Sequence, residues 1–131
     1  MANPPVYPLI WSNDVATILD WAQAALGLEE SWRDPSGGTP VEHAELTWQG
    51  GRISVNVRPP PFAEAGPSGI GIHLDSREAV DATHARAAAA GAEIIQGPEE
   101  SFVAYSFTAL DPDGNQWWVH AETGNLDALR R

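Results

Sequence analysis

The feature that most constrains the fold is a tight turn between two apolar runs near the end of the chain. Residues 111–114 read Asp-Pro-Asp-Gly and separate the runs 101–110 and 115–122. Proline fixes φ at the first corner, the aspartates can bond the neighbouring backbone, and glycine accepts the positive φ that closes the turn. This stretch therefore predicts a β-hairpin, and its carboxylates, Asp111 and Asp113, are assigned to the turn.

The hairpin ends an order of elements that the chain runs through twice. The first half predicts a strand at 6–11, a helix from the caps at 12–14 to Gly27, and strands at 28–32, 41–48 and 52–58. The second half predicts a strand at 70–74, a helix capped by Asp75 or Ser76 that is alanine-rich over 79–90 and ends at Gly91, and strands at 92–96, 101–110 and 115–122. We expect a single domain at 1–131, with module one at 6–58, a proline-rich connector at 59–68, module two at 69–122 and a tail at 123–131.

Several short motifs follow one another over residues 6–122. They are a helix from Asp14 to Leu26-Gly27, Leu74-Asp75 before the helix that closes on Gly91, Gly97-Pro98 between two strands, and Tyr105-Ser106-Phe107 leading to the turn and Asn115. In this order they resemble the vicinal oxygen chelate superfamily, which includes glyoxalase I, extradiol dioxygenases and bleomycin-resistance proteins. The resemblance implies an α+β fold of two β-α-β-β-β modules forming a half-open eight-stranded barrel, with helices on the outer face. It also implies a small-molecule ligand on the concave face and a homodimer.

Composition narrows the classes of partner. Seven basic and eighteen acidic residues give a net charge of −11, which repels nucleic acid and anionic membrane surfaces. The absence of cysteine removes disulfides, thiolate nucleophiles and cysteine-bound zinc. The sequence shows neither a signal-peptide pattern nor an apolar run of membrane-spanning length. We expect a cytoplasmic protein that binds no nucleic acid and no membrane.

The resemblance also indicates where a metal would be bound. Metal-dependent members of the superfamily hold the ion with histidine and glutamate from the first and last strands of each module. The equivalent positions here are Tyr7, Ser54 or Asn56, Gly69 and Trp118. Glycine and tryptophan side chains cannot bind a divalent cation, and neutral tyrosine or asparagine binds weakly. We therefore expect no metal and no cofactor at this site.

The four histidines could still form a relocated metal site. His84 lies mid-helix, where a solvent-facing or partly packed role is expected. His43, His73 and His120 have the strand phase that we assign to the concave face. If the first and last strands of module two are parallel neighbours, His73 and His120 lie close together, whereas His43 lies on a more distant strand. Two ligands make a poor metal site, so we expect His73 and His120 to face a pocket.

Aromatic residues in the same phase predict the wall of that pocket. Trp11 and Trp118 share this phase with Tyr7, whereas Trp117 points to the helices and Trp48 is assigned to packing. A wall of indole rings suits a planar or aromatic ligand. The candidate ligand-binding residues are Tyr7, Trp11, Asn56, His73, Trp118 and His120.

The function that these residues favour is metal-independent binding or sequestration of a small apolar or aromatic molecule, in the manner of bleomycin-resistance proteins. Acidic residues expected near the mouth of the pocket, Glu42, Glu45 or Glu100, would favour a cationic ligand. The fold alone does not choose this function, because one scaffold can host many activities.

Two enzymatic alternatives stay open. One is a metal-dependent lyase, isomerase or dioxygenase. Its ligands would be His43, His73 and His120 with Glu45 or Glu122. The other is a cofactorless enzyme in which His73 or His120 is a general base near Tyr7. The residues at the inherited metal positions disfavour the metal-dependent alternative.

Overall fold

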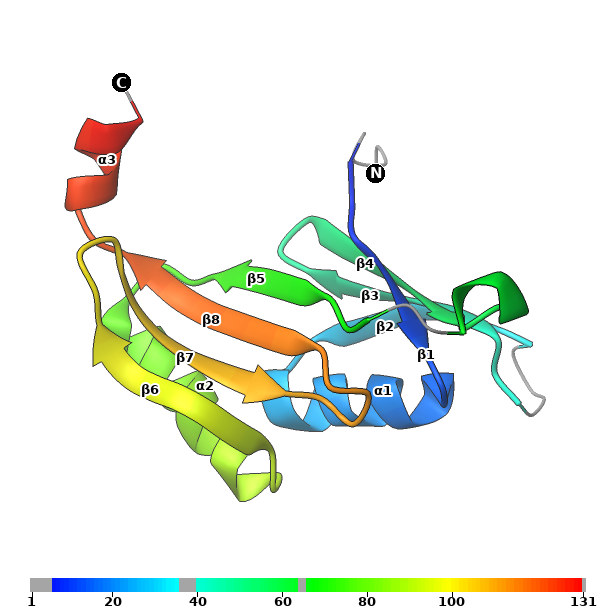
Figure 1. Ribbon diagram of the computed structural model, residues 1–131. Coiled ribbons are helices and arrows are strands. Elements are labelled where there is room, and N and C mark those ends of the chain that lie inside the picture. Colours follow the sequence, from blue (N-terminus) through cyan, green and yellow to red (C-terminus); the bar gives the residue numbers. More distant parts are fainter. Residues whose placement is uncertain (1–5, 36–39, 64–65, 131) are drawn as a thin grey trace.

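The computed structural model describes residues 6–35, 40–63 and 66–130, which form two four-stranded sheets with two helices packed against them (Figure 1). The elements are β1 (Leu9–Ser12), α1 (Val15–Trp21), the π-helix η1 (Ala22–Leu26), β2 (Glu29–Asp34), β3 (His43–Trp48), β4 (Gly51–Val57), the 3-10 helix η2 (Pro60–Phe62), β5 (Gly69–His73), α2 (Arg77–Ala89), β6 (Glu93–Glu100), β7 (Ala104–Leu110), β8 (Gln116–Glu122) and α3 (Asn125–Leu129). The α+β class with a repeated β-α-β-β-β order is confirmed, and the sheets do not join into a closed barrel.

The two sheets are built on one plan. Their strand orders are β1-β4-β3-β2 and β5-β8-β7-β6. In each sheet the strand that comes first along the chain pairs in parallel with the one that comes last, β1 with β4 and β5 with β8. Leu9 therefore lies opposite Ser54, and His73 lies opposite His120. The remaining neighbours are antiparallel. We call the face of each sheet that points away from α1 and α2 its open face. On this face, the parallel pairing places residues of β1 beside residues of β4, and residues of β5 beside residues of β8.

Both helices begin and end where the sequence predicts. The Asp14 side chain accepts a hydrogen bond from the Thr17 N–H at 3.2 Å, and Ser76 caps α2 in the same way. Gly27 and Gly91 follow the last turns with φ of 74° and 81°, a conformation that side chains with a Cβ disfavour. The apolar side of the first helix is buried at Val15, Ile18, Leu19, Ala22, Ala25 and Leu26.

The centre of the core is the indole of Trp117 on β8. This side chain has no exposed surface, and its ring lies 5.7 Å from the ring of Trp21 on α1. Its position on the helix side of the sheet confirms the predicted strand phase. His84 of α2 is half-buried with its ring edge against Phe107, which agrees with the partly packed role expected for it.

The Asp-Pro-Asp-Gly turn does form the β7–β8 hairpin, and Asp111 is the acceptor around which it closes. One carboxylate oxygen of this buried residue accepts from the backbone N–H groups of Asp113 at 2.9 Å and Asn115 at 3.0 Å. The other accepts from the Asn115 amide and the Trp117 indole, both at 2.9 Å. The predicted bonding of the turn to its own backbone is therefore confirmed, and the same carboxylate also fixes the central core side chain.

Two residues of the second half hold the two ends of α1–η1. Asp113 accepts from the Ser12 hydroxyl at 2.6 Å and from the Asn13 N–H at 3.1 Å, just before α1 begins. At the other end, the Arg86 guanidinium of α2 donates to the carbonyl oxygens of residues 23 and 24, at 2.9 and 3.0 Å. These contacts fix the two halves of the chain against each other.

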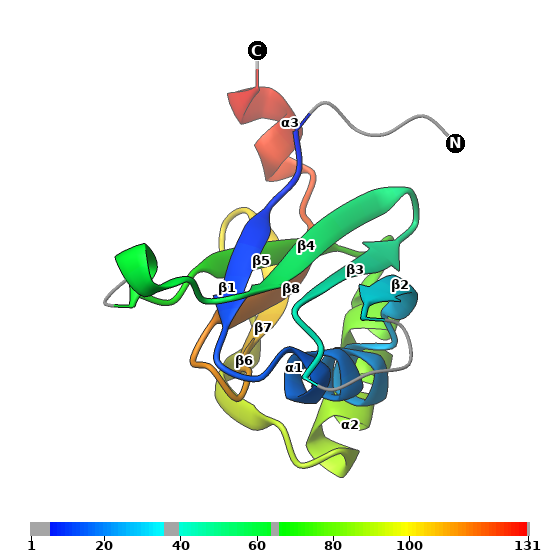
Figure 2. The same ribbon diagram turned by 90° about the vertical axis from the view of Figure 1, so that its right-hand side faces the viewer.

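Some element limits differ from the sequence prediction. The first strand begins at Leu9 rather than residue 6, after Pro8, which has no N–H to donate. Gly97-Pro98 does not separate two strands but lies inside β6 as a bulge, because Gly97 adopts a φ of 77° and the register shifts there. The expected tail contains α3, which projects on the side away from α1 and α2 (Figures 1 and 2).

Four expectations concern the chain as a whole. None of the helices in the described part of the chain has the length and apolar character needed to cross a bilayer. The cytoplasmic location, the homodimer and the division of the chain at 59–68 stay predictions.

Candidate ligand-binding site

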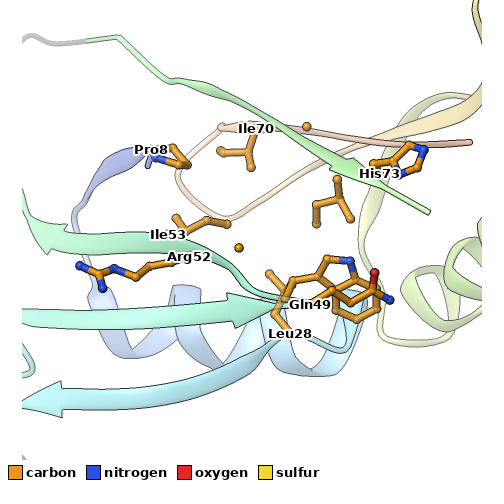
Figure 3. Close-up of a pocket in the computed structure, with 11 residues that line it drawn as sticks. Pro8, Leu28, Gln49, Arg52, Ile53, Ile70 and His73 are labelled. Atoms are coloured by element: carbon orange, nitrogen blue, oxygen red, sulfur yellow. The ribbon is translucent and has the colours of Figure 1, made fainter. Parts of the chain in front are cut away.

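A cavity of about 330 Å3 lies between the two sheets, near the beginning of β4 and along β5. This volume is at the lower end of the range for small-molecule sites, about 300–1,000 Å3. Figure 3 shows Arg52 and Ile53 of β4 on one side of it and Ile70 and His73 of β5 on the other. The described residues that line it are Pro8, Leu28, Trp48, Gln49, Gly51, Arg52, Ile53, Ile70, Gly71, Ile72 and His73.

Much of the cavity wall is an extension of the hydrophobic core. Leu28, Ile53, Ile70 and Ile72 are each at most 7% exposed, and all four belong to the core. The helix-facing phase of β4 and β5 brings them here, because the two sheets separate at this point instead of packing directly on one another. Such a wall favours an apolar ligand, since burial of apolar surface removes it from water.

Arg52 lies on the cavity wall and is held by its neighbours on the first sheet. Its Nε is 2.8 Å from a carboxylate oxygen of Glu45, and its guanidinium stacks 4.6 Å from the ring centre of Tyr7. The other oxygen of Glu45 accepts a hydrogen bond from the Ser31 hydroxyl at 2.6 Å. Tyr7 therefore contacts the cavity-lining Arg52 but is not itself among the residues that line the cavity.

A row of three rings occupies the open face of the second sheet. His73 and His120 lie opposite each other on β5 and β8, with ring centres 5.6 Å apart. The imidazole of His120 stacks on the indole of Trp118 at 3.9 Å, and that indole remains 37% exposed. The predicted proximity of His73 and His120 is confirmed, and His73 joins the row to the cavity.

The surroundings of this row affect two ionisable groups. Partial burial lowers the pKa of His120 below its ordinary value, repulsion from His73 lowers it further, and the Trp118 carbonyl partly offsets the shift. The shift favours the neutral form of the His120 ring. The pKa of Glu122 is also lowered, because its carboxylate accepts two hydrogen bonds from Arg130 at 2.7 and 2.9 Å.

The remaining candidates lie on the open face of the first sheet. The Trp11 indole stacks on the Phe62 ring with centres 5.4 Å apart. The Asn56 amide oxygen is 2.9 Å from Nδ1 of His43, and its amide nitrogen donates to Ser54 at the same distance. His43 thus lies on a different sheet from His73 and His120, as predicted.

The structure groups the six candidate ligand-binding residues only in part. It brings together His73, His120 and Trp118, and it places Tyr7 next to the cavity-lining Arg52, while Trp11 and Asn56 make contacts elsewhere on the first sheet. Their role in binding stays a prediction. The sequence reading missed most of the cavity wall. The missed residues are Pro8, Leu28, Trp48, Gln49, Gly51, Arg52, Ile53, Ile70, Gly71 and Ile72.

The positions equivalent to the family's metal ligands do not fit a metal ion. Gly69 has no side chain, the Trp118 indole is stacked, and Asn56 is bonded to two neighbours. Within the described residues, no three histidine, aspartate or glutamate side chains are grouped so as to hold a metal. The carboxylates of Glu45 and Glu122 are instead paired with arginines. We therefore derive no chemical step through a metal.

The family model described as Glyoxalase/Bleomycin resistance protein/Dioxygenase superfamily matches residues 5–119. The chain belongs to this superfamily. The family suggested by the sequence motifs is thereby confirmed, and the match spans both sheets of the superfamily fold. No curated protein matches the sequence.

Solved structures of superfamily proteins are similar to this one. TioX from Micromonospora sp. ML1 has 23% sequence identity and a TM-score of 0.73, covering 92% of this chain and 97% of its own. Lactoylglutathione lyase from Agrobacterium tumefaciens has 16% identity and a TM-score of 0.71, covering 94% and 96%. The fosfomycin resistance protein FosX from Listeria monocytogenes has 18% identity and a TM-score of 0.69, covering 95% and 97%. At these identities the likeness shows the superfamily fold, and function must be argued from this chain's own residues.

Proposed function

We propose that this member of the superfamily binds a small, largely apolar or aromatic molecule in the cavity between β4 and β5, without a metal. The observation that supports this is the cavity itself, which combines four aliphatic side chains of the core with a few polar residues. This combination is typical of small-molecule sites, in which apolar contact gives affinity and the polar groups fix orientation. Burial of apolar ligand surface would contribute about 25 cal/mol per Å2.

The row of rings on the second sheet extends this proposed site. His73 belongs both to the cavity wall and to the row that continues through His120 to Trp118. A planar ligand seated in the cavity could lay an exposed edge along these rings, where offset or edge contacts between aromatic groups are favourable. We therefore favour a ligand with a flat ring system over a flexible aliphatic chain.

The proposal does not require a cationic ligand. Two of the three carboxylates expected to attract one are already engaged within the chain, Glu45 with Arg52 and Glu100 with Arg77. Each pair leaves little net charge at its position. The proposed ligand is therefore apolar or aromatic, and no positive charge on it is required.

A cofactorless enzyme is the second candidate. One observation favours it: His73 lines the cavity, and its neighbour His120 has a lowered pKa, which favours the neutral ring that can accept a proton. Conversion of a bound compound that stops in His73→Gln, while binding of that compound persists, would establish this candidate. Binding without conversion leaves the protein a binding protein.

Two glycines on β5 offer a matched test of the proposed site. Gly71 lines the cavity, and a Cβ built on it meets nothing closer than His120 Cε1 at 3.8 Å; Gly69 lies on the same face, where a Cβ meets nothing within 4 Å, and does not line the cavity. We expect Gly71→Val to fold normally and to weaken binding of naphthalene compounds at least about tenfold by filling the cavity. Gly69→Val should bind as the wild type does. Isothermal titration calorimetry and thermal melting would measure both properties.

The result that counts against the proposal is equally specific. If several naphthalene and quinoline compounds fail to bind the wild-type protein, or if Gly71→Val and Gly69→Val bind them alike, the cavity is not the binding site. Loss of binding in both variants with a lowered melting temperature would instead indicate damage to β5, and the smaller change Gly71→Ala would then replace Gly71→Val.

A further inference from the structure

The described wall of the cavity lacks the carboxylates that dominate the whole chain. The chain carries eighteen acidic and seven basic residues. Among the described residues that line the cavity there is no carboxylate, and the formally charged side chain is that of Arg52. A ligand inside therefore meets donors and no carboxylate among the described lining residues, whereas the chain as a whole is acidic.

One donor in this wall lacks an acceptor. Trp48 stands at the end of β3 and lines the cavity, and its indole N–H is buried without a hydrogen-bond partner among the described residues. A buried N–H has lost its bonds to water, so it costs free energy until an acceptor reaches it. The indole N–H of Trp117, which is also buried, has such an acceptor in Asp111. Nothing in the described chain plays this part for Trp48.

The other polar groups of the wall can also donate. Gln49 presents an amide and His73 an imidazole, each of which can donate or accept, and Arg52 carries donors alone. The Glu45 carboxylate is ion-paired with Arg52, accepts a hydrogen bond from Ser31 and does not line the cavity. Donors therefore outnumber acceptors around the space that a ligand would fill.

We infer that the ligand carries an acceptor oxygen, a carbonyl or a carboxylate, on its apolar body, and that this oxygen accepts from the Trp48 indole N–H. The inference rests on the proposed function and adds to it the chemical class of the ligand. The polar end of the ligand lies between Trp48 and Arg52, while its apolar part packs on Ile53, Ile70 and Ile72. An ammonium group in the same place would face N–H donors and no carboxylate of the described wall.

Four naphthalene compounds that differ only at position 2 test this directly on the native protein. They carry a methyl, an acetyl, a carboxylate or an aminomethyl group, and their affinities are measured by isothermal titration calorimetry. We expect the acetyl compound to bind about tenfold more tightly than the methyl compound, and the aminomethyl compound to bind most weakly. A further gain for the carboxylate over the acetyl compound would identify an anion as the preferred source of the acceptor, and its absence a neutral carbonyl.

A variant and its control locate the contact. Trp48→Phe keeps an aromatic ring but removes the N–H, so the acetyl compound should lose most of its advantage over the methyl compound. Trp32→Phe, at an exposed indole on β2 outside the cavity, should keep the full advantage. The indole N–H signal that disappears from the 1H–15N spectrum in Trp48→Phe should move to higher proton frequency when wild-type protein binds the acetyl compound. This measurement decides the matter even if Trp48→Phe does not fold.

Equal affinity of the acetyl and methyl compounds, or tightest binding by the aminomethyl compound, overturns the inference while leaving binding in the cavity intact. An unmoved Trp48 indole signal in the acetyl complex overturns it as well. Failure of all four compounds to bind contradicts the proposed function itself, so the two failures are distinguishable.

Discussion

The open faces of the two sheets carry different chemistry on the same strand order. On the first sheet, polar side chains bond to one another, as in the contact between His43 and Asn56 and the ion pair between Arg52 and Glu45. On the second sheet, the rings of His73, His120 and Trp118 lie in a row, and the side-chain hydrogen bond of His120 to a carbonyl is long at 3.5 Å. Hydrogen bonds and an ion pair between side chains hold much of the first face, beside the stack of Trp11 on Phe62, whereas ring-to-ring contacts dominate the second.

This difference indicates how a repeated fold acquires one site. The parallel pairing of first and last strands places the same positions side by side in both sheets, so the scaffold offers two equivalent faces. Internal hydrogen bonds occupy the first face, and the cavity forms where the sheets separate, with Arg52 contributed by the first and His73 by the second. The site thus depends on the asymmetry of the side chains and not on the backbone plan that the halves share.

The largest effect on stability is expected from a comparison of the β3–β4 and β7–β8 hairpins, which differ more than the open faces of the two sheets do. The β3–β4 turn depends on backbone conformation, with Gln49 and Gly50 at φ of 46° and 84°, whereas the β7–β8 turn closes around the buried Asp111 carboxylate. Asp111→Ala would leave several buried N–H groups without an acceptor. We expect the free energy of unfolding to fall by about 3–5 kcal/mol.

Urea denaturation followed by circular dichroism would measure this loss. The exposed Asp75, which precedes α2, supplies the control: Asp75→Asn should change stability by less than about 0.5 kcal/mol. A loss below about 1 kcal/mol for Asp111→Ala would show that the carboxylate is not the support of its hairpin.

A smaller effect is expected where the second hairpin contacts the first half. Asp113→Ala removes the bonds to the Ser12 hydroxyl and the Asn13 N–H, which should cost about 1–2 kcal/mol. Because Ser12→Ala removes one of the same bonds, the double variant should lose less than the sum of the single variants. Strict additivity in the same urea experiment would show that the two side chains do not interact in solution.

The row of rings can be tested through the ionisation of His120. Trp118→Ala would expose the imidazole, so the pKa of His120 should rise toward its ordinary value of about 6.5. NMR titration of the histidine ring signals would report it. Trp11→Ala, which removes the stack on the other sheet, should leave that pKa unchanged, and equal shifts in both variants would contradict the separation of the two faces.

The smallest effect is a dependence of stability on pH. Because the pKa of His120 is lowered in the folded protein, the unfolded chain takes up a proton first as the pH falls. The stability contributed by this group is therefore complete above about pH 6.5 and declines below it, until the folded protein is protonated too. His120→Gln should remove this part of the dependence in urea denaturation at pH 5 to 8. An unchanged slope would assign the dependence to other groups.

Strand and helix limits were largely predictable because alternation and capping are local. The caps at Asp14 and Ser76 and the glycines at residues 27 and 91 all serve as expected. The exceptions are places where the backbone adopts a conformation, such as a bulge within a strand, that residue type alone does not determine. At Gly97 the chain bends and continues in β6, although a glycine before a proline favours a strand end.

The site was less predictable for a physical reason. The nearness of His73 to His120 followed from strand phase and parallel pairing, and it is confirmed. The apolar residues of the cavity wall have the same strand phase as the core. Alternation along the sequence therefore cannot show whether Ile53 packs under a helix or lines a gap between the sheets. Trp48 was assigned to packing on the same grounds. Only the position of one sheet relative to the other separates these cases.

The contacts at the two ends of α1–η1 have a consequence for how the halves recognise each other. A carboxylate from the second half meets the amino end of the helix, and a guanidinium from the same half meets its carbonyl end. Each charge has the sign that its end of a helix dipole attracts. Rotating one half by half a turn would place Asp113 against carbonyl oxygens and Arg86 against N–H groups. The two contacts therefore favour one orientation of the halves. If the halves of this chain were made separately, they would assemble in that orientation.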